Sequence, residues 1–329
     1  MKKPYVVGVD VGGQTAKFGI VDASGNVLKQ SVVVSNTQST AEEFVKDLSN
    51  ALMQLIDGDY NINDIQGIGV GAPNANYYTG CINIAPNLTW CKTHKVEFAK
   101  LLSEAMNGLP VTLTNDANAA AMGEMTYGVA RGMNDFIMIT LGTGVGSGIV
   151  INGKVVYGHD GNAGELGHVC SMRNNGRVCG CGKTGCLEAY TSATGVARTA
   201  RELLELSEDV SLLREIPLEE ITSKDVFDAA IQGDQLAKDI FEFTGRILGE
   251  SLADFSAFSS PEAIVLFGGL TKSGRLIYEP IMENLNLNLM PQWRNKIKVL
   301  FSTLKESDAA ILGASALAWV DKDTELINE

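Results

Sequence analysis

The sequence is short of positive charge and has no apolar run of membrane length. It carries 26 Lys and Arg against 39 Asp and Glu, a formal net charge of −13 over 329 residues. A polyanionic nucleic-acid backbone is a poor partner for such a chain. No stretch reaches the roughly 18–20 apolar residues that a membrane-spanning helix needs. The sequence therefore predicts a protein that binds neither nucleic acid nor membrane.

The first residues also lack the uninterrupted apolar segment of a secretion signal. Gly8 and Asp10 interrupt the apolar run that follows two lysines. Cysteine is scarce, with six in the chain, and three of them are clustered. Clustered thiols without a secretion signal favour metal ligation in a reducing compartment over disulfides. We therefore expect a cytoplasmic protein, and its length can hold two domains.

Two hairpin patterns of the same kind predict a duplicated α/β architecture. Each has a strand, a glycine turn, a second strand, another turn and a third strand. The predicted strands span residues 5–10, 16–22, 27–34, 136–141, 149–151 and 154–157, with glycine turns at 12–13 and 142–148. Helical periodicity and apolar runs between and after these patterns predict helices and central strands. A repeat of this kind indicates two related halves.

Two aspartates stand at the ends of predicted strands. Asp10 stands at a strand end beside Gly12 and Gly13, where backbone N–H groups can approach a phosphate and the carboxylate can hold the magnesium of ATP. Asp116 stands where a strand meets a helix and can be either a helix N-cap or a base that accepts a hydroxyl proton. At a helix N-terminus we expect its carboxylate to stay ionised.

The second glycine turn, within Leu141–Gly148, predicts another phosphate cradle. The residues after it have a hairpin pattern, whereas a dinucleotide fingerprint needs a helix directly after the glycines. No Gly-Lys-Ser/Thr follows, so the turn is not a Walker A loop either. An NAD site is therefore not expected here.

Residues 158–190 gather three thiols, Cys179, Cys181 and Cys186, within eight positions. The glycines between them let the backbone wrap around an ion, and three thiolates with one imidazole form the tetrahedral set that structural zinc prefers. His168 is the favoured fourth ligand, with Cys170 and His159 as rivals. The spacing is not that of a zinc finger.

Two acids flank the thiols. Glu165, His168 and Glu188 can offer hydrogen-bond acceptors to adjacent hydroxyls of a polyol. The alternative is that each acid is a solvated surface charge.

Together these segments resemble the ROK family of sugar kinases and sugar-responsive repressors, which has the two-domain actin/hexokinase-type ATPase fold. The resemblance covers nearly the whole chain. The matching segments are VGVDVGGQTAKFGIVD, GAPN, APNLTW, NDANAAAMGE, ITLGTGVGSGIVING, GHDGNAGELGHV, CGCGKTGCLE and IVLFGGL. The resemblance implies an α/β fold with a duplicated mixed sheet, flanking helices and a cleft between the domains. We expect a smaller domain of residues 1–117 plus 309–329, and a larger one of residues 118–308 with the zinc-binding loop 158–190.

The resemblance also implies roles for individual residues. Asp116 matches the catalytic base. The matches to sugar ligands are Asn115, Glu165, His168 and Glu188. The matches to ATP and magnesium ligands are Asp10, Gly12, Gly13, Gln14, Thr15, Gly142, Thr143, Gly144, Gly268 and Gly269. The matches to zinc ligands are His168, Cys179, Cys181 and Cys186.

The implied activity is phosphorylation of a hexose by ATP, with glucose as the first choice. Fructose, mannose or an N-acetylhexosamine is the alternative substrate, and a sugar-sensing protein without turnover is the alternative function. The resemblance implies a homodimer. The family usually has threonine at the position of Gln14, and many members have glycine at that of Asn74. Repressor members carry a helix-turn-helix ahead of the first phosphate motif, which here begins within ten residues of Met1, so no such domain is expected.

Overall fold

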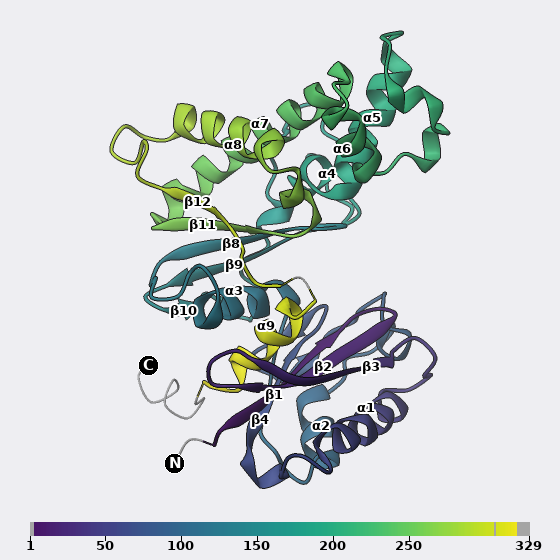
Figure 1. The fold of residues 1–329 in the computed structure, drawn as a ribbon, viewed down its shortest axis with the longest axis vertical. Helices are drawn as coiled ribbons and strands as arrows, with labels where there is room; N and C mark the ends of the chain where they lie inside the picture. The colour runs from purple at the N-terminus through teal and green to yellow at the C-terminus, as the bar shows by residue number, and fades with distance from the viewer. Residues whose placement is uncertain (1–2, 306, 321–329) are drawn as a thin grey trace. The chain divides into compact units, whose positions relative to one another are not determined.

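The computed structural model describes residues 3–305 and 307–320 and divides the chain into two compact units (Figure 1). The first unit comprises the chain up to Met133, the segment Val155–Ala163 and the chain from Thr303 onward. The second unit comprises Asn134–Lys154 and Gly164–Ser302. Each unit is built on a five-stranded mixed sheet.

The sheet of the first unit has the order β3-β2-β1-β4-β7. Its strands are β1 (Tyr5–Val11), β2 (Thr15–Asp22), β3 (Val27–Val34), β4 (Ile65–Gly71) and β7 (Val111–Thr114). The first three form an antiparallel meander, whereas β1, β4 and β7 run parallel. Parallel strands end at the same edge of a sheet, so the residues after β1 and after β7 share one edge. A short hairpin of β5 (Ala75–Asn76) and β6 (Cys81–Ile82) lies outside this sheet.

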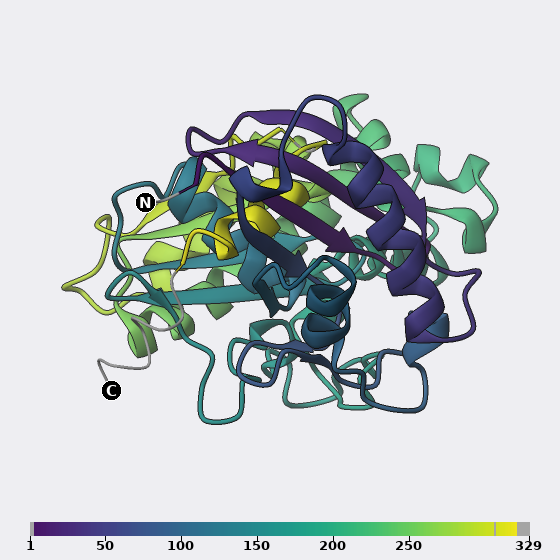
Figure 2. The same cartoon turned by 90° about the horizontal axis from the view of Figure 1, so that it is seen from below.

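Helices cover both faces of the first sheet, as Figures 1 and 2 show. One face carries α1 (Ala41–Ile56) and α2 (Phe98–Ala105), and the other carries α3 (Asp116–Tyr127) and α9 (Ala309–Leu317). A capping box of Thr40 and Glu43 starts α1. The sequence indicates a capping box one residue earlier, at Ser39 and Glu42.

Helix α9 lies against the backbone of β1 and β4 without intervening side chains. A Cβ on Gly8 or Gly69 would collide with the carbonyl oxygen of Ile311 or Ala314, respectively. A Cβ on Gly123 of α3 would lie 2.8 Å from the Cα of Gly313. Helix α3 therefore packs on α9 and belongs to the first unit, whereas the expected domain boundary at residue 117 cuts the chain at the start of this helix.

The sheet of the second unit has the order β10-β9-β8-β11-β12. Its strands are β8 (Phe136–Leu141), β9 (Val145–Ile151), β10 (Lys154–Val155), β11 (Ala263–Phe267) and β12 (Lys298–Phe301). Strands β8 and β9 are antiparallel, and β8, β11 and β12 are parallel. The expected glycine turn of residues 142–148 is shorter in the structure, because β9 begins at Val145 and Gly146 pairs with Thr140.

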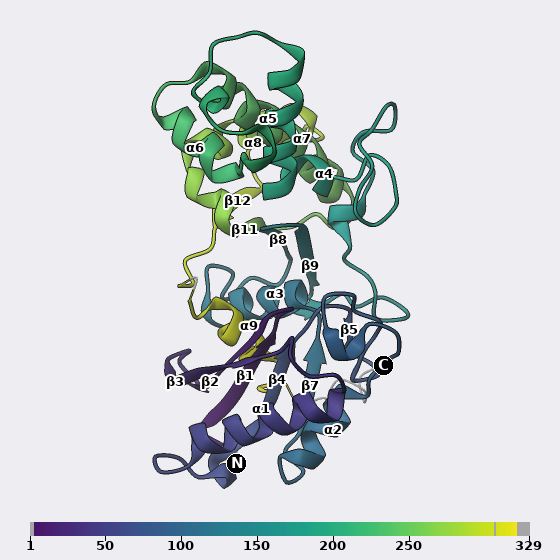
Figure 3. The ribbon, with the colours of Figure 1, turned by 90° about the vertical axis from the view of Figure 1, so that its right-hand side faces the viewer.

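The helices of the second unit gather on one side of its sheet (Figures 1 and 3). They are α4 (Glu188–Thr191), α5 (Ala193–Leu206), α6 (Ser223–Ile231), α7 (Gln235–Ser259) and α8 (Arg275–Asn288). Gly245 and Gly249 let α7 approach α8, since a Cβ on Gly249 would lie 2.6 Å from Ile281 O. Within residues 3–305 and 307–320, no helix is both long and apolar enough to cross a membrane.

Candidate active site and thiol cluster

Asp116 is the first residue of α3, directly after the buried strand β7. The N-cap is Asn115, whose side chain accepts a hydrogen bond from Asn118 N at 2.8 Å. Asp116 Oδ1 accepts from the adjacent Ala117 N, also at 2.8 Å. Because Asn115 caps the helix, the N-cap alternative for Asp116 is wrong. The Asn115 amide oxygen is occupied in this cap, which leaves its Nδ2 as the group that can donate to a ligand.

The charge of Asp116 acts on Asp10 within the first unit. Asp116 is solvent-exposed yet has many protein atoms around it, and this desolvation raises the pKa of its carboxyl group. Desolvation also raises the pKa of Asp10 to about 6, and the negative charge of Asp116 adds to the shift, whereas Lys17 opposes it. Hydrogen bonds from the backbone N–H groups of Ala117 and Asp116 lower the pKa of the Asp116 carboxyl group, as expected at a helix N-terminus, but desolvation outweighs them. Two carboxylates that repel each other form a setting that favours a cation.

The first glycine turn joins β1 to β2. Gly12 N donates to Thr15 O at 3.0 Å, and Ser35 N donates to Gln14 O at 2.9 Å, so the turn is fixed through its backbone. A Cβ on Gly13 would lie 3.0 Å from Asn87 O, which explains the need for glycine there. The side chains of Gln14 and Thr15 are exposed.

Asn74 follows Ala72-Pro73 at the end of β4. Its backbone has φ +53°, in the left-handed region that glycine or asparagine adopts most readily. Its Nδ2 donates to Ile84 O at 2.7 Å. The departure from glycine at this position is therefore compatible with the turn.

The second glycine turn, Gly142 to Gly144, is closed by a hydrogen bond from Gly142 N to Gly144 O at 3.0 Å. A Cβ on Gly142 would meet nothing within 4 Å, so this residue faces open space. A Cβ on Gly144 would collide with Glu188 Oε2. The same carboxylate oxygen accepts from Val145 N at 2.9 Å. The turn and the predicted sugar ligand Glu188 are therefore in direct contact.

Gly268 and Gly269 follow β11 and begin a short 3-10 helix. Gly268 has φ +111°, and a Cβ there would lie 2.5 Å from Leu141 O. Gly268 is thus required for the backbone of the fold itself. A Cβ on Gly269 would meet nothing within 4 Å.

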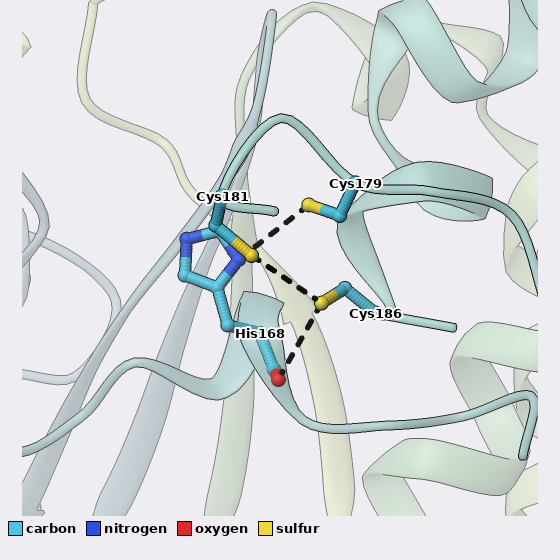
Figure 4. A group of neighbouring side chains, drawn as sticks. All are labelled: His168, Cys179, Cys181 and Cys186. Atoms are coloured by element: carbon cyan, nitrogen blue, oxygen red, sulfur yellow. Dashed lines mark hydrogen bonds between the residues drawn. The ribbon is translucent and has the colours of Figure 1, made fainter. Parts of the chain in front are cut away.

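The structure gathers His168, Cys179, Cys181 and Cys186, which Figure 4 shows turned toward one another. Their ligand atoms all lie within 4.8 Å of one another. His168 Nδ1 is 3.8 Å from Cys179 Sγ, and the sulfurs of Cys181 and Cys186 are 3.7 Å apart. The rivals His159 and Cys170 are not part of this group, which is the metal-ligating cluster found among the described residues.

These separations fit a tetrahedral zinc site. Zinc–sulfur bonds of about 2.3 Å place the sulfurs of a tetrahedron roughly 3.8 Å apart. Burial raises the pKa of Cys179 to about 12, whereas the backbone N–H of Lys183 lowers the pKa of Cys181. The identity of the donors, three thiols and one imidazole, and the separations between them fit zinc.

Glu165 lies at the start of the short 3-10 helix Leu166–His168. Ser147 of β9 holds the backbone on both sides of this acid: its hydroxyl donates to Gly164 O and accepts from Leu166 N at 3.0 Å. Ser147 is buried, and its place within a glycine-rich run gives no sign of this role in the sequence.

Arg177 is a second positioning residue that no sequence motif indicates. Its guanidinium donates to Glu202 Oε2 and to Ala189 O, at 3.0 Å each from Nε and Nη1. It also lies over the ring of Tyr190, 4.7 Å from the centroid. Arg177 thus ties the cysteine-bearing loop to the helix that begins at Glu188.

Comparison with known proteins settles the relationship. The model of the ROK family matches residues 6–320. The chain belongs to the ROK family. The glucokinase of Halalkalibacterium halodurans is 35% identical over 328 residues, which cover 99% of this chain and 97% of that enzyme. The DNA-binding regulator NagC of Escherichia coli K12 is 28% identical over 95% of this chain, which corresponds to 75% of NagC.

Solved structures give the same relationship. A ROK family glucokinase from Streptomyces griseus, in complex with glucose and AMPPNP, superimposes with a TM-score of 0.77 at 33% identity. The match covers 96% of this chain and 99% of that one. The expected two-domain hexokinase-type ATPase fold is confirmed.

Proposed function

We propose that this protein is an ATP-dependent hexose kinase that phosphorylates glucose. The family relationship and the full-length similarity to glucokinases support this assignment. The single structural observation that carries it is the pair Asn115–Asp116. Asn115 caps α3, so the carboxylate of Asp116 stands at a strand end, exposed and with no capping role.

In this proposal Asp116 accepts the proton of the sugar's primary hydroxyl, and the oxygen then attacks the γ-phosphoryl group. Asp10 would hold the magnesium that accompanies ATP, whose charge offsets the negative charge developing on the phosphates. Backbone N–H groups of the two glycine turns other than those of Gly12 and Gly142, which close the turns, would donate to phosphate oxygens. Toward the phosphates of ATP, the protein acts by positioning hydrogen-bond donors and charges.

Sugar recognition is assigned to Asn115, Glu165, His168 and Glu188. His168 would bind zinc through Nδ1, the nitrogen that faces Cys179. The ring is then held in one orientation and presents Nε2 to a sugar hydroxyl. The zinc has a structural role here.

A coupled assay for ADP release over glucose, fructose, mannose and N-acetylhexosamines tests the proposal. The expected result is the highest kcat/KM with glucose. A higher kcat/KM with another hexose would replace the substrate, and turnover with none would remove the enzymatic assignment.

The similarity to NagC makes a sugar-responsive protein the second candidate. Sugar binding in calorimetry without ADP release under any ATP and magnesium condition would favour it. We also propose that the protein is a cytoplasmic homodimer. Size-exclusion chromatography with light scattering tests the oligomeric state.

A further inference from the structure

Cys170 lies directly opposite Cys186 in the loop that carries the thiol cluster. The two residues form an isolated antiparallel bridge outside the named strands. Two backbone hydrogen bonds flank the bridge, Ser171 N to Gly185 O at 2.8 Å and Leu187 N to Val169 O at 2.9 Å. This pattern makes Cys170 and Cys186 a non-hydrogen-bonded pair. In such pairs the Cα atoms are about 4.5 Å apart and the side chains are closest.

That backbone geometry is the one a disulfide needs. Bridged cysteines have Cα atoms about 4.4–6.8 Å apart and Cβ atoms about 3.5–4.5 Å apart. The two thiols currently have other neighbours: Cys170 Sγ lies 3.7 Å from Thr184 O, and Cys186 Sγ lies 3.7 Å from Cys181 Sγ. Rotation about the Cα–Cβ bonds can therefore bring the sulfurs together without a shift of the backbone.

Cys170 is also the thiol of the pair that a small oxidant reaches first. It is half-buried and lines a cavity of about 430 Å³ together with Ser171, Arg173, Glu250 and Asp254. Cys186 is fully buried on the other side of the bridge. Cys170 stands outside the four-residue metal-ligating cluster, so a bound ion would not engage its sulfur.

We propose that Cys170 and Cys186 form a reversible disulfide, which removes Cys186 from the thiol cluster. A hydroperoxide oxidises the Cys170 thiol to a sulfenic acid and is itself reduced to an alcohol, or to water if it is hydrogen peroxide. The Cys186 sulfur then attacks the Cys170 sulfur, the S–S bond forms, and the hydroxyl of the sulfenic acid leaves as water with the proton lost from Cys186. A dithiol reductant reverses the change by thiol–disulfide exchange.

A Cys186 sulfur in a disulfide cannot also be a thiolate ligand of zinc. Disulfide formation and occupancy of the three-thiol site therefore exclude each other. This exclusion rests on the proposed zinc site, whereas the disulfide itself does not.

Tryptic mapping of the full-length protein tests the disulfide directly. Cleavage after Lys154, Arg173, Arg177, Lys183 and Arg198 places Cys170 in peptide 155–173, Cys179 and Cys181 in 178–183, and Cys186 in 184–198. The folded protein is treated with one equivalent of hydrogen peroxide, alkylated, digested and analysed by mass spectrometry. We expect peptide 155–173 linked to 184–198, and loss of the link with dithiothreitol. A link between 178–183 and 184–198 in its place, or no link at all, would overturn the proposal.

Variants separate the two parts of the inference. In Cys170→Ser the link should be lost and peroxide-driven zinc release, followed with a chromogenic chelator, should slow. The matched control Cys81→Ser removes a buried thiol in the first unit and should retain wild-type behaviour. Equal zinc-release rates in wild type and Cys170→Ser would overturn the exclusion between disulfide and metal. If purified wild type contains no zinc, the zinc proposal fails and the peptide link still decides the disulfide.

Discussion

The two units have sheets of the same strand order but different chemistry at their strand ends. In the first unit the penultimate residue of β1 is Asp10, and Asp116 follows Asn115, the residue that links β7 to α3. In the second unit the position equivalent to Asp10 is Thr140, whose hydroxyl accepts from Gly146 N at 3.1 Å. Glycines follow both β8 and β11. At these equivalent strand ends the first unit thus carries carboxylates, whereas the second unit carries a hydroxyl group and glycines.

This difference indicates a division of labour on a duplicated framework. Carboxylates suit proton acceptance and cation binding, and glycine turns suit phosphate. The repeat places the carboxylates and the glycine turns at the carboxyl ends of strands, where parallel sheets bind ligands. The following predictions test this division, from the largest expected effect to the smallest.

Asp116→Asn should lower kcat by roughly 10²–10⁴-fold, the usual range for loss of a general base. The fold should persist because Asn115 caps α3. Sugar binding should also persist. Steady-state kinetics measures kcat, circular dichroism measures the fold, and a sugar titration measures binding. Near-normal turnover would return the carboxylate to a structural role.

The second glycine turn can be broken in two distinguishable ways. Gly142→Val should raise the KM for ATP by about tenfold or more, which corresponds to a loss of about 1.4 kcal/mol in binding free energy. Sugar affinity should stay unchanged, because a Cβ on Gly142 meets open space. Gly144→Val should weaken both ligands because its side chain displaces the carboxylate of Glu188. Separate titrations of nucleotide analogue and glucose measure this. Equal losses for sugar in the two variants would contradict the contact between Glu188 and the turn.

Cys181→Ser should lose bound zinc and weaken glucose binding by about tenfold, in the range found when a metal site loses its support. ATP affinity should change little, because the thiols and the glycine turns act on different ligands. Metal analysis and calorimetry provide the measurement, with Cys91→Ser of the first unit as the control. Zinc loss with unchanged glucose affinity would separate the metal from the sugar site.

Asp10→Asn should stabilise the unliganded protein at neutral pH. The pKa of Asp10 is raised to about 6 in the folded state, so the folded protein holds this proton more tightly than the unfolded chain. The contribution of Asp10 to the free energy of unfolding should therefore fall as the pH rises from about 4 to 6. The asparagine variant should lack this pH-dependent contribution. Thermal unfolding at pH 4.5 and 7.5 without magnesium measures the difference. If the stability of the asparagine variant depends on pH as strongly as that of wild type, or more strongly, the pKa of Asp10 is not raised.

Local patterns in the sequence predicted the strands of both hairpin patterns and the glycine turns between them. The three thiols and His168 could be grouped because metal ligation demands a recognisable set. Other features depend on register. That β9 begins at Val145, and that Cys170 faces Cys186, follow from which residues pair across the chain.

Prediction from the sequence was also limited where two neighbouring residues suit the same structural role. Asn115 and Asp116 are both good N-caps, and only the start of α3 shows which one caps it. Ser147 and Arg177 act through backbone groups distant in sequence, so their own neighbours gave no signal.

The close contact of α9 with Gly8 and Gly69 has a consequence for the order of folding. The strands β1 and β4 are separated from the helix that covers their face by the whole of the second unit. The core of the first unit therefore closes only through a contact between distant parts of the chain, and such long-range closure is slow. We expect the first unit to complete its core after the second unit.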